Sequence, residues 1–232
     1  NFFWLTKRTG GQKQISDYLE FVETGILPLG CENVLKKCNA AISMSRYGAR
    51  QAKIKHGIDC YYIPHAIDSD VYYPMLKEER KFLKENFIVY LYNGVNITGA
   101  LRDKFVVGSV FRNQPRKFAD RTFKAFKYFA KDKPDAVLLL HCDPNDVAQS
   151  FNMMAMIKEL GIENKVFFTG MKWYDGFSLE QMRSVYNVMD IFMLTTSGEG
   201  FGIPTIEAMA CGVPPLCTDY TTSAELIIED GQ

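Results

Sequence analysis

Two glutamates flank a glycine-rich turn near the end of this 232-residue chain, and seven residues separate Glu199 from Glu207. We expect a helix that begins at Pro204, because the fixed φ of proline suits the first helical position, and that has ended by Gly212. Three glycines can give the preceding turn positive φ values: Gly198, Gly200 and Gly202. N–H groups at a helix start favour an anion or a hydroxyl oxygen, and carboxylates accept hydrogen bonds from hydroxyls. The pattern predicts a site for a polyhydroxylated ligand that carries a phosphate.

A basic loop follows a predicted strand that ends at Val110. Three cations, Arg112, Arg116 and Lys117, fall within six residues of one another. The loop precedes a predicted helix, so it lies at the carboxyl edge of a parallel sheet, where open α/β folds bind ligands. The planar fork of an arginine and the compact charge of a lysine suit a diphosphate. Because the glutamate turn lies at the same sheet edge, we expect both segments to serve one ligand.

The elements that carry these loops read as a Rossmann-like parallel α/β sheet with flanking helices, because apolar runs alternate with amphipathic stretches after about residue 86. The expected strands are Phe105–Val110, Ala136–His141, Val166–Thr169, Ile191–Thr195 and Val213–Thr218. Helical spacing of apolar residues predicts a helix around Phe123, another that ends at Gly161, and a third that opens with a capping box of Ser178 and Gln181.

The first 64 residues predict a single βαβ unit. Its elements are strand Ala41–Ser45, helix Arg46–His56 and strand Cys60–Ile63. Residues 1–40 add a turn-rich stretch at Thr9–Gly11 and a helix at Glu32–Cys38, but no complete sheet. One βαβ unit cannot cover both faces of a sheet. We therefore interpret residues 1–64 as a truncated domain and residues 65–232 as a second domain that is cut at its C-terminal end.

Composition narrows the classes of function. The formal net charge is zero, which argues against bulk nucleic-acid binding and against strong attraction to an anionic membrane. No apolar run approaches the ~20 residues that cross a bilayer. The six cysteines form no C-x-x-C pair and no zinc pattern with the three histidines. We expect a reducing, cytoplasmic compartment.

The stretch S-G-E-G-F-G-I-P-T-I-E-A-M-A-C-G-V-P at 197–214 resembles the Glu-x7-Glu signature of retaining glycosyltransferases of the GT-B fold, family 4 type. The segment I-P-H-A-I-D at 63–68 is similar to the I-P-N-G-V-D segment that ends the N-terminal lobe in that family, with His and Ala in place of Asn and Gly. The resemblance covers roughly residues 40–232. It implies that 65–232 is the C-terminal nucleotide-sugar-binding lobe and that 1–64 belongs to the N-terminal lobe.

The resemblance also implies a reaction and roles for residues. A hexose would pass from a nucleoside-diphosphate sugar to an acceptor hydroxyl with retention of configuration, without a metal or a cofactor. Arg112 and Lys117 would bind the diphosphate and stabilise the charge that grows on it as it leaves. Glu199 would contact the sugar, and Glu207 would bind the ribose. The other implied donor contacts are Gly200, Phe201, Gly202, Ile203, Met171 after a strand, and Thr222, where many relatives have glycine.

The expected partners follow from the same resemblance. The donor would be linked to UDP, GDP or ADP, and the acceptor would be a sugar, a glycan or a lipid-linked molecule. The acceptor site would belong to the missing N-terminal lobe, which could also contact the cytoplasmic membrane face. We therefore expect this chain alone to bind donor but to transfer sugar poorly or not at all.

Other interpretations fit parts of the sequence. Asp68-Ser-Asp70 spells the D-x-D triplet by which another glycosyltransferase class binds a metal, but here it lies in the interlobe linker. Glu199 and Glu207 could be the acid and base of a glycosidase, yet a helix start opposes the raised pKa that an acid needs. A dehydrogenase lobe would need a G-x-G-x-x-G, and the sequence lacks this pattern. A non-catalytic nucleotide-sugar binding module fits the same residues and stays open.

Two further features have structural interpretations. The mixed-charge run from Lys77 to Lys81 is expected to be a solvated helix face. His141 ends a predicted buried strand, and we expect a structural histidine there rather than a catalytic one.

Overall fold

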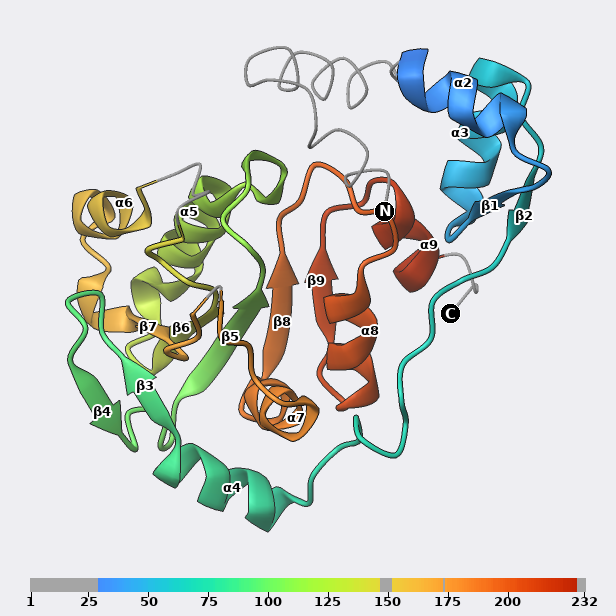
Figure 1. Cartoon of the computed structure of the whole chain (residues 1–232). Coiled ribbons are helices and arrows are strands. Elements are labelled where there is room, and N and C mark those ends of the chain that lie inside the picture. The colour runs from blue at the N-terminus through green and yellow to red at the C-terminus, as the bar shows by residue number, and fades with distance from the viewer. Residues whose placement is uncertain (1–28, 147–151, 173, 229–232) are drawn as a thin grey trace. The chain divides into compact units, whose positions relative to one another are not determined.

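The computed structural model describes residues 29–146, 152–172 and 174–228 (Figure 1), so the predicted turn at Thr9–Gly11 lies outside the described residues. The chain divides into two compact units. The first unit is Asn1–Ala66, Ser197–Gly202 and Asp219–Gln232, and the second unit is Ile67–Thr196 and Ile203–Thr218.

Among the described residues, the second unit is built on a seven-stranded sheet in the order β4-β3-β7-β6-β5-β8-β9. The strands are β3 (Ile88–Tyr90), β4 (Asn96–Thr98), β5 (Phe105–Val110), β6 (Ala136–His141), β7 (Val166–Phe168), β8 (Ile191–Leu194) and β9 (Pro215–Cys217). The pairs β7–β6, β6–β5, β5–β8 and β8–β9 are all parallel. The prediction of a mostly parallel α/β sheet is therefore confirmed.

One edge of the sheet departs from the predicted parallel arrangement. Strand β3 is antiparallel to both β4 and β7. Each of β3 and β4 has three residues, too few for an alternating pattern to be recognised. The signal that could have revealed the hairpin is Asn93-Gly94, because Asn-Gly is typical of tight hairpin turns. Gly94 has a φ of 83°, which a glycine adopts without strain.

Helices flank the sheet of the second unit. They are α4 (Lys77–Asn86), α5 (Ala119–Phe129), α6 (Met153–Leu160), α7 (Leu179–Asn187) and α8 (Ile203–Ala210), with 3₁₀ helices at Pro115–Lys117, Ala130–Asp132 and Glu163–Lys165. The predicted capping box of Ser178 and Gln181 opens α7, with both reciprocal hydrogen bonds present. Gly161 ends α6 in the left-handed conformation. Helix α8 begins at Ile203, so the prediction that Pro204 is its first residue is wrong by one position.

The sheet is covered on both faces, which strand β6 shows most clearly because all its residues are buried. Val137 and Leu139 belong to a core cluster that also contains buried residues of α7 and α8. Leu138 and Leu140, on the opposite face, belong to a cluster that contains buried residues of α5 and α6. A strand buried on both faces reads as a continuous apolar run rather than as an alternation, which is why the sequence predicted β6 with its correct ends.

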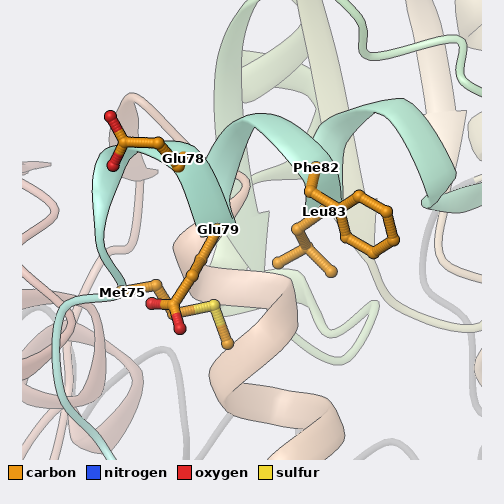
Figure 2. Close-up of a pocket in the computed structure, with 5 residues that line it drawn as sticks. All are labelled: Met75, Glu78, Glu79, Phe82 and Leu83. Atoms are coloured by element: carbon orange, nitrogen blue, oxygen red, sulfur yellow. The ribbon is translucent and has the colours of Figure 1, made fainter.

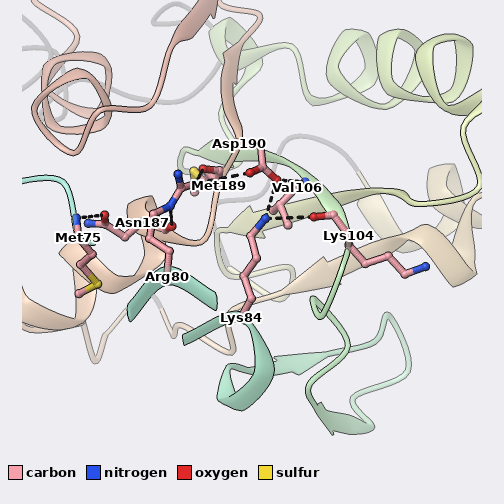
Figure 3. Close-up of polar contacts among 8 residues, drawn as sticks. All are labelled: Met75, Arg80, Lys84, Lys104, Val106, Asn187, Met189 and Asp190. Atoms are coloured by element: carbon pink, nitrogen blue, oxygen red, sulfur yellow. Dashed lines mark hydrogen bonds and ion pairs between the residues drawn. The ribbon is translucent and has the colours of Figure 1, made fainter. Parts of the chain in front are cut away.

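A cluster of charged groups connects α4 to the start of β8 (Figure 3). Asp190 Oδ2 accepts hydrogen bonds from Lys84 Nζ at 2.6 Å and from the Val106 N–H at 2.8 Å. Arg80 donates from Nε to the carbonyl oxygen of Asn187 and from a terminal nitrogen to that of Met189, each at 2.8 Å. The expectation that the run 77–81 is a solvated face is therefore wrong for Arg80, although the neighbouring residues of the run are exposed.

The first unit contains α2 (Leu29–Lys37), β1 (Ala41–Ser43), α3 (Arg46–His56), β2 (Cys60–Tyr62) and α9 (Thr222–Ile228). Strands β1 and β2 pair in parallel with α3 between them in sequence, as predicted. Ser45 caps α3 by accepting from the Gly48 N–H. The Glu225 carboxylate, from α9, accepts from the N–H groups of Arg46 and Tyr47. An acidic side chain at a helix start also interacts favourably with the helix dipole, so α9 stabilises α3.

We expect Asp190→Ala to lower the free energy of unfolding by roughly 2–4 kcal/mol, because it removes the carboxylate that pairs with Lys84 and Arg80 and accepts the Val106 N–H. Urea denaturation measures this loss. The matched control is Asp135→Ala, since Asp135 is 70% exposed and pairs with Lys104. An exposed pair contributes less than about 1 kcal/mol. Equal, small losses in the two variants would contradict a central role for Asp190.

Candidate functional site

The loop after β5 carries Arg112, and a buried carboxylate holds it. Arg112 donates from a terminal nitrogen to Asp146 Oδ1 at 2.9 Å, and its Nε donates to Asp146 Oδ2. The Asp146 side chain, in the loop after β6, is 1% exposed, whereas that of Arg112 is 41% exposed. The hydrogen bonding of Arg112 to the Asp146 carboxylate is the leading cause of a raised pKa for Arg112. Since a guanidinium has five N–H donors, this pair fixes the fork while leaving donors for an anion.

Lys117 lies at the end of the 3₁₀ helix Pro115–Lys117, and its side chain is buried. The backbone on either side of it is held by threonines that follow β8. Thr196 Oγ1 donates to the Arg116 carbonyl oxygen, and Thr195 Oγ1 donates to that of Phe118, each at 3.1 Å. Phe118 has a φ of 47°, a left-handed conformation that is strained for a bulky residue. The basic loop is therefore tied to the neighbouring parallel strand. Arg116 is half-buried.

Glu207 lies one turn into α8 and is half-buried. Its Oε2 accepts a hydrogen bond from the Tyr186 hydroxyl at 2.6 Å, and the Tyr72 hydroxyl lies near the same carboxylate. Burial raises the pKa of Glu207, and the two neighbouring tyrosine hydroxyls act in the opposite direction. The expectation that the helix start keeps the pKa of this carboxyl low is therefore wrong, because desolvation is the larger effect.

The turn from Ser197 to Gly202 belongs to the first unit and is held by two threonines. Thr222 Oγ1 donates to the carbonyl oxygens of Glu199 at 2.9 Å and Gly200 at 3.1 Å. The Glu199 N–H donates to Thr221 Oγ1 at 3.1 Å. Thr222 is buried, so its hydroxyl acts on the turn backbone. This backbone support explains what threonines do where the resemblance implies glycines.

Only one of the three glycines in this turn takes the positive φ predicted for all of them. Gly202 has a φ of 96°, whereas Gly198 and Gly200 do not lie in the left-handed region. Phe201 is buried, and its ring meets that of His65 edge to face with the centroids 5.3 Å apart. The His65 ring, in a position where the resemblance implies asparagine, therefore supports the turn.

The other predicted contacts, Met171 and Ile203, belong to the second unit. Met171 is half-buried and follows β7, and Ile203 is 41% exposed at the start of α8. Arg112, Lys117 and Glu207 share this unit with them, in segments that follow β5 and β8. The first unit contains the remaining predicted residues, Glu199, Gly200, Phe201, Gly202 and Thr222. All of these assignments stay predictions.

Three residues that sequence reasoning missed are the partners of predicted ones: Asp146, Tyr72 and Tyr186. Asp146 follows β6 at the sheet edge that binds ligands in open α/β folds, so its position was a usable signal. The two tyrosines gave no signal, because each sits in an apolar stretch that reads as core.

His141 lies at the end of β6 and is buried. Its Nδ1 is 2.9 Å from Thr169 Oγ1, and its ring meets that of Phe177 edge to face. Burial lowers its pKa to about 4. The ring is thus neutral at physiological pH and satisfied by protein groups, which agrees with a structural role.

A surface hollow of about 450 Å³ lies on α4 and is lined by Met75, Glu78, Glu79, Phe82 and Leu83 (Figure 2). It shares no residue with the predicted site. Within the part of the chain that the structure describes, no three His, Cys, Asp or Glu side chains gather in a way that could hold a metal ion. Asp68, of the D-x-D triplet, accepts the N–H of Asp70 in a local turn. None of the described helices is both long enough and apolar enough to cross a membrane.

Comparison with known proteins identifies the family. The model of the family "Glycosyl transferases group 1" matches residues 96–232. The matched segment contains Arg112, Lys117, Glu199 and Glu207. The chain therefore belongs to the group 1 glycosyl transferases.

Two curated relatives show how far the similarity extends. Mannosylfructose-phosphate synthase from Agrobacterium fabrum is 26% identical over 163 residues, which are 68% of this chain and 32% of that protein. D-inositol 3-phosphate glycosyltransferase from Mycolicibacterium smegmatis is 31% identical over 120 residues, which are 51% of this chain and 26% of that protein. This chain thus matches about a third or less of the length of these relatives.

Solved structures share the fold. Anabaena HepE, in complex with UDP and glucose, superposes with a TM-score of 0.65 at 18% identity, over 94% of this chain and 51% of that one. The C-terminal domain of the group 1 glycosyl transferase LpcC from Francisella tularensis gives a TM-score of 0.52 at 22% identity, over 71% of this chain and 76% of that one. These likenesses agree with a GT-B C-terminal lobe.

We expect the stability of the protein to fall as His141 is forced to accept a proton. Its folded pKa of about 4 lies below the ordinary 6.5. The unfolded chain therefore binds the extra proton first, and stability that is fully present above pH 6.5 is lost as the pH falls towards 4. The loss amounts to about 3 kcal/mol.

Urea denaturation across this pH range measures the slope. His141→Asn should have a shallower slope, because carboxylates titrate alike in both proteins. His65→Asn, which replaces an exposed ring, should keep the wild-type slope. An unchanged slope in His141→Asn would contradict a neutral, buried His141.

Proposed function

We propose that residues 65–232 form the donor lobe of a retaining glycosyltransferase that transfers a hexose from a nucleoside-diphosphate sugar to an acceptor hydroxyl. The observation that carries this proposal is a matched pair of held groups in the second unit. Asp146 holds the Arg112 cation, and tyrosine hydroxyls hold the Glu207 carboxylate. A diphosphate needs the first kind of group and a ribose the second. Each is anchored from within the protein before any ligand arrives.

Arg112 and Lys117 are proposed to bind the donor diphosphate. Cleavage of the bond between the sugar and the diphosphate leaves negative charge on the departing oxygen. Cations fixed beforehand stabilise that charge without reorganising, which is how preorganised sites lower a barrier. The ion pair with Asp146 and the threonine contacts to the 116–118 backbone fix the two cations.

Glu207 is proposed to bind the ribose hydroxyls and Glu199 the hydroxyls of the transferred sugar. Thr222 would support the second role through the Glu199 and Gly200 carbonyl oxygens. Gly200, Phe201, Gly202 and Ile203 would present backbone N–H groups, and Met171 would lie beside the base. The complex of HepE with UDP and glucose favours UDP as the first nucleotide to test.

Every residue in this assignment contacts the donor, and none is assigned to the acceptor. We therefore expect the 232-residue chain to bind the donor nucleotide but to transfer sugar slowly or not at all. A lipid-linked acceptor would bring the enzyme to the cytoplasmic face of a membrane. A non-catalytic nucleotide-sugar binding module is the alternative, because the same residues would serve both.

We expect calorimetric titration with UDP, GDP and ADP to show selective binding of one nucleotide. Arg112→Ala with Asp146→Asn should weaken that binding by at least roughly tenfold, because the double change removes a charge-assisted contact without leaving a buried carboxylate unpaired. Glu207→Ala should also weaken it.

The charge-matched control is Arg102→Ala, since Arg102 is 61% exposed and pairs only loosely with Glu85. It should leave the affinity within twofold of the wild-type value. No nucleotide binding by a folded wild-type chain, or an equal loss in the control, would contradict the proposed donor site.

We expect donor turnover to separate the enzyme from the binding module. A protein that contains this chain together with a complete N-terminal lobe should release nucleoside diphosphate from the donor when an acceptor is present. NMR of the product should show the anomeric configuration of the donor. Tight donor binding with no consumption by that longer protein would favour the module.

A further inference from the structure

Two tyrosine hydroxyls converge on Glu207 from different elements of the second unit. Tyr186 belongs to α7 and is fully buried, and Tyr72 precedes α4 and is 5% exposed. Their rings meet edge to face with centroids 6.1 Å apart. The Tyr186 hydroxyl donates to Glu207 Oε2 at 2.6 Å, and the Tyr72 hydroxyl lies near the same carboxylate. Packing holds a buried tyrosine ring in place, so the direction in which its hydroxyl donates is fixed as well.

Packing alone does not require these hydroxyls. Phenylalanine would fill the same space, and Tyr186 already packs against Phe192 on the sheet. A buried hydroxyl costs free energy unless it is hydrogen-bonded. The sequence thus places two buried hydroxyls near one carboxylate of the Glu-x7-Glu pattern, and that of Tyr186 is hydrogen-bonded to it.

We propose that Tyr72 and Tyr186 are positioning residues that fix the Glu207 carboxylate for the ribose hydroxyls of the donor. The inference rests on the proposed function of Glu207. A carboxylate has acceptor sites for about four hydrogen bonds. The Tyr186 phenol occupies one of these sites, and the site that faces Tyr72 can take a second phenol, which leaves the others for a pair of neighbouring hydroxyls. Both phenols lower the pKa of Glu207 and so favour the ionised carboxylate, which is the acceptor that a diol needs.

The surroundings of Glu207 set its protonation together with the tyrosines. Burial raises its pKa, and the two phenols lower it. Cys211, later in the chain after α8, is protonated at neutral pH because burial, reinforced by Glu207, raises its pKa to about 11. Arg183 and Glu180 of α7 act on Cys211 and on Tyr72 respectively. Removing one phenol should therefore shift the titration of Glu207 to higher pH.

The experiment is a double-mutant cycle on nucleotide affinity in the 232-residue chain. UDP is the probe, or GDP or ADP if the titration above selects one of these. Tyr186→Phe and Tyr72→Phe are each made in two backgrounds, the wild-type protein and the Glu207→Gln variant. We expect each phenylalanine to weaken binding about fivefold or more with Glu207 present, and less than twofold with Glu207→Gln. Tyr128→Phe, at a position 86% exposed, is the matched control and should have no effect.

Two readouts separate positioning from mere stability. The first is the pH dependence of affinity, whose acid limb should move to higher pH in Tyr186→Phe. The phosphate of the nucleotide titrates in the same range but is common to both proteins. The second is the corresponding 2′,3′-dideoxynucleoside diphosphate, for which Tyr186→Phe should bind as well as the wild-type protein.

The outcomes are distinct. Weaker nucleotide binding in Glu207→Ala but unchanged affinity and pH profile in both phenylalanine variants would overturn the positioning role and leave the donor site standing. The positioning role would also be overturned if each phenylalanine variant lost as much nucleotide affinity in the Glu207→Gln background as in the wild-type background. If the folded wild-type chain binds none of the three nucleotides, the proposed function fails and this inference fails with it.

Discussion

The second unit depends on parallel pairing among buried strands. Strands β5 and β6 pair over six residues, and β8 pairs with β5 on its other side. Helices cover both faces of such a sheet, so polar side chains can reach solvent only from the loops at the strand ends. This constraint explains why Arg112 and Asp146 meet, although 34 positions separate them in the sequence. It also explains why the threonines after β8 hold the loop after β5.

Charge at this edge is stabilised by partners rather than by water. Asp146 is almost completely buried, which is tolerated because it accepts two hydrogen bonds from a guanidinium. Glu207 is partly desolvated, which is tolerated because the buried Tyr186 phenol donates to it. Side chains anchored in this way lose little freedom when a ligand arrives, and this lowers the entropic cost of binding. The same groups would be poorly suited to a purely structural role, since apolar residues of similar volume would stabilise the fold as well.

The sequence predicted most of the larger unit, because strands buried on both faces give continuous apolar runs and helices give regular stripes. Strands β5 and β6 have their predicted ends, and the cap of α7 is formed by Ser178 and Gln181. The β3–β4 hairpin was missed, since three-residue strands carry no period. The donor residues came from a motif, but their partners did not. Tyr186 looks like core in the sequence, and only the fold shows that its hydroxyl meets Glu207.

The central claim is that the second unit binds the diphosphate and the ribose of a donor nucleotide through Arg112, Lys117 and Glu207. A crystal structure of this chain with UDP tests that claim most directly. We expect diphosphate oxygens within hydrogen-bonding distance of Arg112 and Lys117, and ribose hydroxyls on the Glu207 carboxylate. A well-ordered nucleotide that contacts none of these three side chains would contradict it.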